Sequence, residues 1–365
     1  MSRKLHEIAL SFLVDIGPVT ARNLVSYCGS AQAVFEETTQ RLLKIPGVGK
    51  HRAAFNDRSK ALKRAESELK HLEKNNLNAH FYLDESYAER LKVYPDSPII
   101  LYTTEGVEFN HPRTLAIVGT RKPTDYGRMK CEQIVQELRK YDIAIVSGLA
   151  YGVDVIAHKT SVANGIPTIG VLGNGLPNVY PSTHNSIAKK MQSMGGGLVT
   201  QFSSEEKPDR EHFPMRNKTV AYMTDATLVI ESKASGGSMI TANFAFHNHK
   251  DLFALPGRTI DTFSEGCNKL IKANLAQMVT CGEDIVKSML WDIEKPKARQ
   301  AELFHDLSDE ESKIINSIQA SPEIHVDKLA KEVGMNNAQL AAALLQLELK
   351  GLIRQSAGKR YLLAN

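Results

Sequence analysis

Small and positively charged residues cluster at the ends of several short apolar runs in the middle of the chain. They are Gly119, Thr120, Arg121 and Lys122 at the end of 114–119, Ser147 and Gly148 at the end of 142–148, Asn174 after 167–173, Arg216, Asn217 and Lys218 near the start of a helical segment, and Ser235, Gly236, Gly237 and Ser238 after 226–232. Glycine lets a backbone approach a phosphate closely, and a helix N-terminus attracts anions. The combination predicts an anion-binding crevice at which Arg121, Lys122, Arg216 and Lys218 meet, and several phosphate sites in succession suit a polymer better than a mononucleotide. The alternative is that the glycines only allow helices to pack closely on strands.

Other kinds of site do not match the spacing of the residues. The P-loop pattern is absent, and the stretch at 173–175 lacks the third glycine of the dinucleotide-binding fingerprint. No GxSxG sequence surrounds a serine, so a serine at 235–238 is predicted to cap a helix that begins at Met239. His247 and His249 lie only two residues apart, and no acidic pair completes a metal site. We therefore expect no catalytic residue, no metal and no cofactor.

The segments that hold these residues alternate between apolar runs and helical patterns. The runs lie at 114–119, 142–148, 167–173, 197–202, 226–232 and 251–257. Continuous apolar runs indicate strands buried on both faces, and strand–helix alternation implies right-handed crossovers in a parallel sheet. The fold class predicted for 81–285 is α/β, a Rossmann-like, doubly wound and mostly parallel sheet. Ligands of such sheets bind outside the carboxyl ends of the strands.

The first 80 residues are predicted to form a helical module of the helix-hairpin-helix, or SAM-like, type. Gly47, Gly49 and Lys50 lie in a Pro-Gly-Val-Gly-Lys turn, whose backbone N–H groups can face a phosphate whatever the base sequence. Residues 1–75 hold 13 basic and 8 acidic residues, a net charge of +5. We expect an auxiliary DNA contact here, with duplex DNA as a candidate partner. A glycine turn that joins two packed helices is the alternative.

The pattern at the end of the chain is typical of a winged-helix domain at 309–365. Three helical stretches are followed by a predicted β-hairpin that turns at Ala357-Gly358. Residues 286–308 have no regular period and are expected to be a linker. The third helix, at 336–350, offers Asn and Gln side chains but no Arg, and the domain is neutral. Protein–protein contact, self-association and DNA contact therefore all stay open for this domain.

Composition assigns these three parts to an ordinary globular protein. The 365 residues have 42% hydrophobic and 24% charged content and a net charge of +4, as is typical of chains that bury a core. No apolar run approaches the ~18 residues that a membrane-spanning helix requires. The four cysteines lie far apart and form no CxxC pair, so neither a disulfide framework nor a zinc ribbon is indicated. We expect a cytoplasmic protein without a membrane partner.

Six strings of residues occur in the order found in a known family. They are VGTRKPTDYG (118–127), SGLAYGVDVIAH (147–158), GNGLPNVYPSTH (173–184), FPMRNKTVAYMTDATLVIESKASGGSMITANFA (213–245), ALPG (254–257) and GCNKLI (266–271). They closely resemble the DprA/Smf family of DNA-processing proteins of bacterial natural transformation. The resemblance implies a non-enzymatic protein that binds and protects incoming single-stranded DNA, loads the RecA recombinase on it, and forms a homodimer through the Rossmann-like domain. The family's phosphate-binding positions correspond here to Arg121, Ser147, Gly148, 216–218 and 235–238.

Two departures from the family pattern concern how bases are held. The chain has Thr-Gln at 200–201 where many members have Ser-Glu, and Asn-Val at 178–179 where some members have an aromatic residue. Sequence-tolerant binding often stacks bases on aromatic side chains. Tyr180 or Tyr151 would be the substitute here, with a buried packing role as the alternative for Tyr180.

Two other functions stay open at this point. Phosphoribohydrolases of similar fold use a Pro-Gly-Gly-x-Gly-Thr-x-x-Glu motif, and the chain reads Ser-Gly-Gly-Ser-Met-Ile-Thr-Ala at 235–242. The second Gly-Thr and the glutamate are missing, so this interpretation lacks a general base. The other possibility is a scaffold whose winged helix docks partner proteins.

Overall fold

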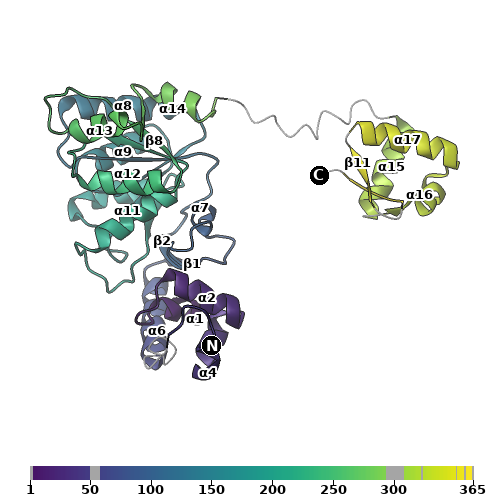
Figure 1. Ribbon diagram of the computed structural model, residues 1–365, viewed down its shortest axis with the longest axis horizontal. Helices are drawn as coiled ribbons and strands as arrows, with labels where there is room; N and C mark the ends of the chain where they lie inside the picture. Colours follow the sequence, from purple (N-terminus) through teal and green to yellow (C-terminus); the bar gives the residue numbers. More distant parts are fainter. Residues whose placement is uncertain are drawn as a thin grey trace. The chain divides into compact units, whose positions relative to one another are not determined.

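The chain folds into two compact units, residues 1–292 and residues 293–365. The computed structural model describes residues 3–49, 58–292, 308–321, 324–350, 352–356 and 359–363. The first unit combines a group of front helices with a large sheet that has helices on both faces (Figure 1). The second unit is small and contains helices and a short sheet.

The front of the first unit is helical, as the sequence predicts. Its helices are α1 (Arg3–Ser11), α2 (Pro18–Cys28), α3 (Ala31–Glu36), α4 (Thr39–Leu42) and α6 (Arg58–Lys74). Pro18 begins α2 where no intrahelical N–H bond is needed, and Gly29 ends it in the left-handed conformation. The side chain of Ser30 then accepts a hydrogen bond from the Ala33 N–H and starts α3. Local caps therefore set the sharp turns of this module.

Nine strands in the described residues form one mixed sheet in the order β1-β2-β6-β5-β4-β3-β7-β8-β9. They are β1 (Leu77–Phe81), β2 (Ile100–Thr104), β3 (Thr114–Gly119), β4 (Ala144–Ser147), β5 (Thr168–Leu172), β6 (Gly197–Thr200), β7 (Ala226–Ile230), β8 (Asp251–Ala254) and β9 (Gln277–Met278). Along the sheet, every neighbouring pair from β6 through β5, β4, β3, β7 and β8 to β9 is parallel, which confirms the predicted fold class. The antiparallel strands β1 and β2 extend the sheet beyond β6, and the sequence does not predict them.

Helices cover both faces of the sheet (Figure 1). The helices that follow β1 in this unit are α7 (Glu89–Lys92), α8 (Asp125–Leu138), α9 (Val153–Ala163), the 3-10 helix η1 (Ser182–His184), α10 (Asn185–Gln192), α11 (His212–Tyr222), α12 (Gly237–His247), α13 (Glu265–Lys272) and α14 (Gly282–Ser288). Side chains alternate along β3, so Leu115 packs in the cluster with α8 and α14, and Ala116 packs in the cluster with α11 and α12. Both faces of the central strands are therefore buried.

The order of the strands fixes where a ligand crevice can form. From β3 the chain moves outward through β4 and β5 to β6, and it resumes at β7 on the other side of β3. The crossovers on the two sides of β3 consequently diverge outside the carboxyl ends of β3 and β7. This is the switch point at which doubly wound sheets bind their ligands.

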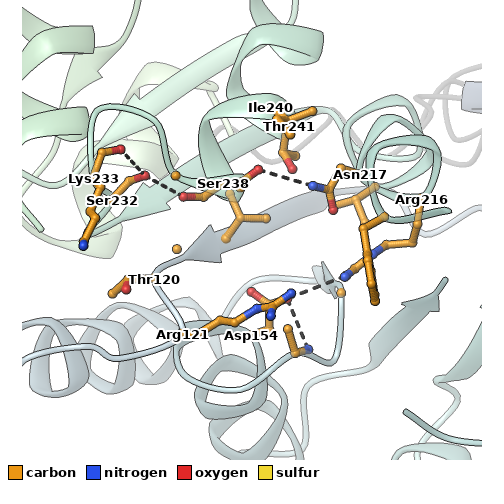
Figure 2. Close-up of a pocket in the computed structure, with 18 of the residues that line it drawn as sticks. Thr120, Arg121, Asp154, Arg216, Asn217, Ser232, Lys233, Ser238, Ile240 and Thr241 are labelled. Carbon is orange, nitrogen blue, oxygen red and sulfur yellow. Dashed lines mark hydrogen bonds and ion pairs between the residues drawn. The ribbon is translucent and has the colours of Figure 1, made fainter. Parts of the chain in front are cut away.

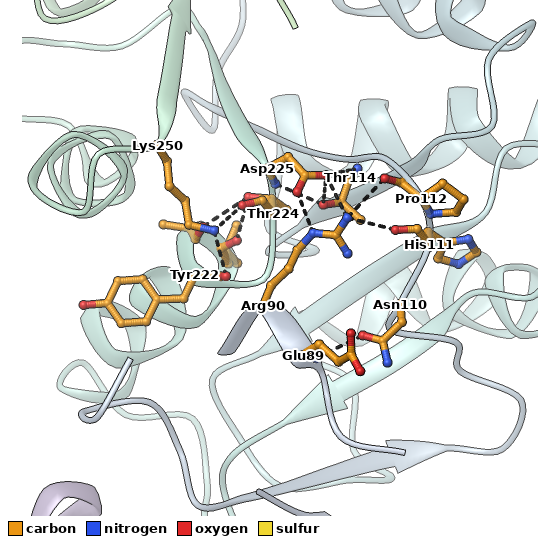
Figure 3. Close-up of polar contacts among 12 residues, drawn as sticks. Glu89, Arg90, Asn110, His111, Pro112, Thr114, Tyr222, Thr224, Asp225 and Lys250 are labelled. Atoms are coloured by element: carbon orange, nitrogen blue, oxygen red, sulfur yellow. Dashed lines mark hydrogen bonds and ion pairs between the residues drawn. The ribbon is translucent and has the colours of Figure 1, made fainter. Parts of the chain in front are cut away.

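Arg90 and Asp225 tie the segment between β1 and β3 to the opposite, amino end of the sheet (Figure 3). Arg90 donates from Nε and Nη2 to the two carboxylate oxygens of Asp225 at 2.6 and 2.9 Å. Asp225 also accepts from the Thr114 N–H at 2.8 Å and from its hydroxyl at 3.0 Å. Nearby, Lys250 donates to the carbonyl oxygens of Tyr222 and Thr224, at and beyond the end of α11. These bonds hold α7 against the start of β3 and β7.

The front helices are tied to the sheet by α6. Glu68 is buried and accepts hydrogen bonds from the Ser204 N–H at 3.0 Å and from the Ser204 hydroxyl at 2.6 Å. Arg64 donates to Glu206 at 3.0 Å and to the Ser203 hydroxyl at 3.2 Å. These contacts therefore bind the loop 203–206, which follows β6, to α6 of the front module.

The second unit is a winged-helix domain, which confirms the prediction for this part of the chain. Its elements are α15 (Asp309–Ala320), β10 (Ile324–His325), α16 (Val326–Val333), α17 (Asn337–Leu349), β11 (Ile353–Ser356) and β12 (Arg360–Leu363). Ser308 and Glu311 form a capping box on α15, and Asn336 caps α17. The hairpin turn predicted at 357–358 lies outside the described residues. Of the expected linker, 286–288 belong to α14, and 293–307 lie outside the described residues.

Candidate functional site

A crevice of about 570 Å³ lies at the carboxyl ends of β3, β4 and β7. Figure 2 shows three parts of it: Thr120 and Arg121 after β3, Ser232 and Lys233 after β7, and Arg216 on α11. The sequence predicts that the residues following these strands meet at one edge, and the structure brings most of them together there. The predicted residues that line the crevice are Gly119, Thr120, Arg121, Lys122, Gly148, Arg216, Asn217, Gly236, Gly237 and Ser238.

The crevice is strongly positive. Its described lining holds five basic side chains and a single carboxylate, that of Asp154. The basic residues are Arg121, Lys122, Arg210, Arg216 and Lys233. All of them except Arg216 are exposed to solvent, so their charge is available to a bound anion. Such an excess in a concave surface focuses the field on an incoming polyanion.

Arg216 is buried and lies against Asp154 on α9, with Nη1 3.7 Å from Oδ2. The guanidinium occupies the space that a side chain at position 148 would need. A Cβ added at Gly148 would lie only 1.2 Å from Arg216 Nη1. Burial raises the pKa of the Asp154 carboxyl, and the charge on Arg216 opposes that rise. The Ala150 N–H donates to the same carboxylate at 3.3 Å. Gly148 therefore makes room for a buried ion pair that forms part of the crevice floor.

The turn that carries Arg121 and Lys122 is fixed by contacts with Ile230 and Glu231 at the end of β7. A Cβ at Gly119 would lie 2.0 Å from the Ile230 carbonyl oxygen, and the Thr120 N–H donates to the Glu231 carbonyl at 2.7 Å. The carboxylate of Glu231 accepts hydrogen bonds from the N–H of Thr124, at 2.8 Å, and from its hydroxyl. Backbone packing and a buried acid thus fix the turn while its two basic side chains project outward.

The N-terminus of α12 forms another wall of the crevice. The helix begins at Gly237 with Gly236 as its N-cap, and no side chain accepts a capping hydrogen bond. The prediction that a serine caps a helix beginning at Met239 is therefore wrong. The Ser238 hydroxyl instead donates to Ser232 at 2.8 Å, because the helix starts two residues earlier and turns this side chain toward the end of β7. A Cβ at Gly237 would meet no atom within 4 Å, so the first turn of the helix is open to a ligand.

Aromatic side chains lie in and beside the crevice, and the sequence analysis did not single out Phe213, which lines it. The ring of Phe213 lies 5.8 Å from the guanidinium carbons of both Arg121 and Arg216. Tyr180 is 52% exposed and lies 6.3 Å from Phe213, so it is not a buried packing residue. Tyr151 is 49% exposed. The spacing of Phe213 and Arg216, three residues apart on one helix, is the signal that would have indicated Phe213.

Four predicted residues lie outside the crevice lining. Lys218 donates to the carboxylate and carbonyl of Asp96 at 3.2 and 2.9 Å, because residues two apart on a helix point to nearly opposite sides. The prediction that it meets Arg121 and Arg216 is wrong. Ser147 is buried and donates to the Ile117 carbonyl at 2.6 Å. Asn174 is also buried and donates to backbone carbonyls of its own loop, and Ser235 is exposed on the turn after β7.

The front module is described only in part at its hairpin. Gly47 adopts φ +80°, and a Cβ at Gly47 or Gly49 would meet no atom within 4 Å. Lys50 lies outside the described residues. Among the described residues, no group of three or more His, Cys, Asp or Glu side chains could hold a metal ion. Nor does any helix in the described ranges have the length and apolar character needed to cross a membrane.

Comparison with sequence families assigns each part of the chain. The sequence model described as "DNA recombination-mediator protein A" matches residues 78–290. The models described as "DprA winged helix domain" and "SAM-like Helix-hairpin-helix tandem" match 295–359 and 9–54. The chain is 31% identical over 304 residues to Protein Smf of Escherichia coli, covering 81% of this chain and 80% of that protein. It is 34% identical over 207 residues to DNA processing protein DprA of Streptococcus pneumoniae, covering 56% and 71%.

Two solved structures share this architecture. The X-ray structure of DNA processing protein A from Streptococcus pneumoniae is 26% identical, with a TM-score of 0.63 over 79% of this chain and 98% of that one. DNA processing protein A from Helicobacter pylori is 27% identical, with a TM-score of 0.51 over 60% of this chain and 97% of that one. The Helicobacter pylori structure is described as giving insight into a unique single-stranded DNA binding mode of that protein.

Proposed function

Because the chain belongs to the DNA recombination-mediator protein A family, also called DprA/Smf, we propose that it binds single-stranded DNA in the crevice between β3 and β7. The observation that carries this proposal is the pairing of charge with an aromatic face. Five basic side chains line the crevice, and two of them flank the ring of Phe213. The single-stranded DNA binding described for the Helicobacter pylori relative supports the same ligand.

The chemistry of the crevice suits a strand bound without base-specific contacts. Arg121, Lys122 and Arg210 present charge to phosphates, and the open first turn of α12 presents backbone N–H groups to them. Phe213 offers a face on which any base can stack. The buried pair of Arg216 and Asp154 holds this surface in shape rather than supplying a mobile charge. Binding should therefore tolerate all sequences and depend strongly on salt.

Further parts of the function rest on the family. We assign the chain to natural transformation in the cytoplasm, where it would protect incoming single strands, load RecA on them and act as a homodimer through the Rossmann-like domain. Duplex DNA would be an auxiliary ligand of the front hairpin at 45–49. We assign no catalytic role, because the carboxylate found among the described lining residues, Asp154, is buried against Arg216 and is not placed to act as a general base.

The test is a salt titration of oligo-dT binding by Arg121→Ala, with Lys218→Ala as the matched control. Removal of one phosphate contact should reduce the log–log salt slope by about 0.7 on a single strand. Arg121→Ala should weaken binding to every sequence and flatten the slope, because its side chain faces the crevice. Lys218→Ala removes the same charge from a site occupied by Asp96 and should bind like the parent. If both variants bound oligo-dT with the parent's affinity and slope, the crevice would not be the DNA site.

A further inference from the structure

The crevice has a second aromatic residue at its other end, on the loop 257–264 that follows β8. Phe263 is half-buried and lines the crevice together with Lys233. The Lys233 ammonium lies 5.5 Å from the centre of the Phe263 ring. A ring with a cation beside it repeats the chemistry of Phe213 beside Arg121. In Figure 2 Lys233 and Arg216 lie on opposite sides of Ser238, which belongs to the first turn of α12.

The loop that carries Phe263 is anchored at both ends. Asn268 on α13 donates to the Gly257 carbonyl at 3.0 Å and accepts from the Gly257 N–H at 3.2 Å. A Cβ at Gly257 would lie 2.1 Å from the hydroxyl oxygen of Ser264, so the two ends of the loop pack directly against each other. The N–H of Gly266 donates to the Ser232 carbonyl at 2.8 Å. These contacts fix Phe263 beside the β7 turn that carries Lys233.

A strand that crosses the crevice would meet three different surfaces in succession. Phe213 lies beside Arg216 on one side of the open first turn of α12, and Phe263 lies beside Lys233 on the other side (Figure 2). Aromatic rings accept bases, whereas helix N-termini accept phosphates. The order of surfaces along the crevice is therefore base, phosphate, base.

We propose that Phe263 and Lys233 form a second subsite for a nucleobase of single-stranded DNA, separate from the one at Phe213. This proposal rests on single-strand binding in the crevice. Stacking on Phe263 would be tolerant of sequence, since every base has a π-face, and Lys233 would contact the adjoining phosphate. Two base platforms on either side of a phosphate site select for a strand whose bases are separated. A duplex, whose bases are paired and stacked on one another, cannot supply both bases.

The experiment compares the binding of oligo-dT and of a strand of the same length with abasic sites to the full chain and to Phe263→Ala. Loss of one stacked base should weaken oligo-dT binding by about 5-fold to about 150-fold. Binding of the abasic strand should not change, because it has no base to stack. Phe263→Tyr keeps the ring and should bind oligo-dT like the parent. Phe246→Ala, at the far end of α12 and 40% exposed, is the matched aromatic control and should also leave binding unchanged.

Arg121→Ala, measured in parallel, separates failure of the subsite from failure of the DNA site. If Arg121→Ala weakens oligo-dT binding and Phe263→Ala does not, the second subsite is refuted and single-strand binding in the crevice stands. If neither variant weakens binding, the crevice itself is refuted as the DNA site. A loss in Phe263→Ala that is equally large on the abasic strand, or that Phe263→Tyr shares, would show that the ring only supports the loop and would overturn the proposal.

Discussion

Two glycine-rich regions of this chain are expected to face phosphate, and they are built differently. In the front hairpin, Gly47 adopts a positive φ, and a Cβ at Gly47 or Gly49 would contact nothing within 4 Å. In the crevice, a Cβ at Gly148 or Gly119 would overlap atoms of Arg216 or Ile230. Glycine therefore sets the direction of the backbone in the hairpin, whereas in the crevice floor it makes room for neighbouring atoms. The close-packing alternative raised by the sequence is correct for these floor positions, and the charge around them supplies the affinity for anions.

The largest expected effect comes from filling the space beside Arg216. Gly148→Ala places a methyl group where the guanidinium lies, so Arg216 must move and leave the Asp154 carboxylate buried without its partner. We expect a loss of about 3–5 kcal/mol in the free energy of unfolding, measured by urea denaturation. Gly49→Ala is the matched change in the hairpin and should shift that free energy by no more than about 1 kcal/mol. Equal losses in the two variants would remove the distinction between the regions.

A pH titration of stability tests the burial of His158 on α9, the helix that also carries Asp154. His158 lies one turn after Asp154 on α9, and its ring bonds to the Thr168 hydroxyl at 2.7 Å. Burial lowers the pKa of His158 to about 3, from an ordinary value of about 6.5. The stability that the neutral ring contributes is therefore complete above about pH 6.5 and is lost as the pH falls from there toward 3, by about 1.4 kcal/mol per pH unit and about 2 kcal/mol at pH 5. His158→Gln should lose this part of the acid dependence, and an unchanged pH profile would contradict the burial of a neutral ring at this position.

The hairpin should respond to a change that strains the backbone. Gly47→Ala forces an alanine into φ +80°, although its Cβ would have free space. We expect a loss of about 1–2 kcal/mol in unfolding free energy, smaller than that of Gly148→Ala and again measured in urea. Gly47→Asn should recover part of the loss, because Asn tolerates the left-handed conformation better than Ala. A loss that Asn does not reduce would mean that space, as in the crevice, limits this position too.

The smallest effect on stability should come from the open glycine of the crevice. Gly237 lies on the first turn of α12, and a Cβ added to it would have no atom within 4 Å. Gly237→Ala should change the unfolding free energy by about 0.5 kcal/mol or less. Its methyl group would nevertheless occupy the approach to the helix N-terminus and should weaken oligo-dT binding in a filter or anisotropy assay. Unchanged binding would show that phosphate does not reach this turn.

The sequence predicts those parts of the fold that form from continuous apolar runs. The runs at 114–119 and 226–232 are apolar throughout most of their length, and they become buried central strands. The β1 strand has a mixed pattern in which Phe81 is its fully buried residue, and β2 follows an acidic, proline-containing stretch, so neither stands out. Tertiary pairing places them in the sheet, β2 against β6 and β1 against β2, rather than local preference.

The site is predicted where it depends on strand ends and missed where it depends on side-chain direction. Gly119, Arg121 and Gly236 meet because parallel strands end at one edge. Lys218 is adjacent to this set in sequence, yet the helix turns it toward Asp96. Phe263 lies on a loop, and no periodicity relates it to the rest of the site, so only the fold could place it.

The contacts of α6 have a consequence for how the first unit opens. Leu5 and Ile8 of the front helices belong to the same hydrophobic cluster as Tyr102 and Val199 of the sheet. Releasing the front module would expose this shared core and free the loop 203–206, whose Glu206 carbonyl accepts from the Gly175 N–H. The front helices and the sheet should therefore open as one cooperative unit, with amide hydrogens in α6 and β2 exchanging at a common, slow rate.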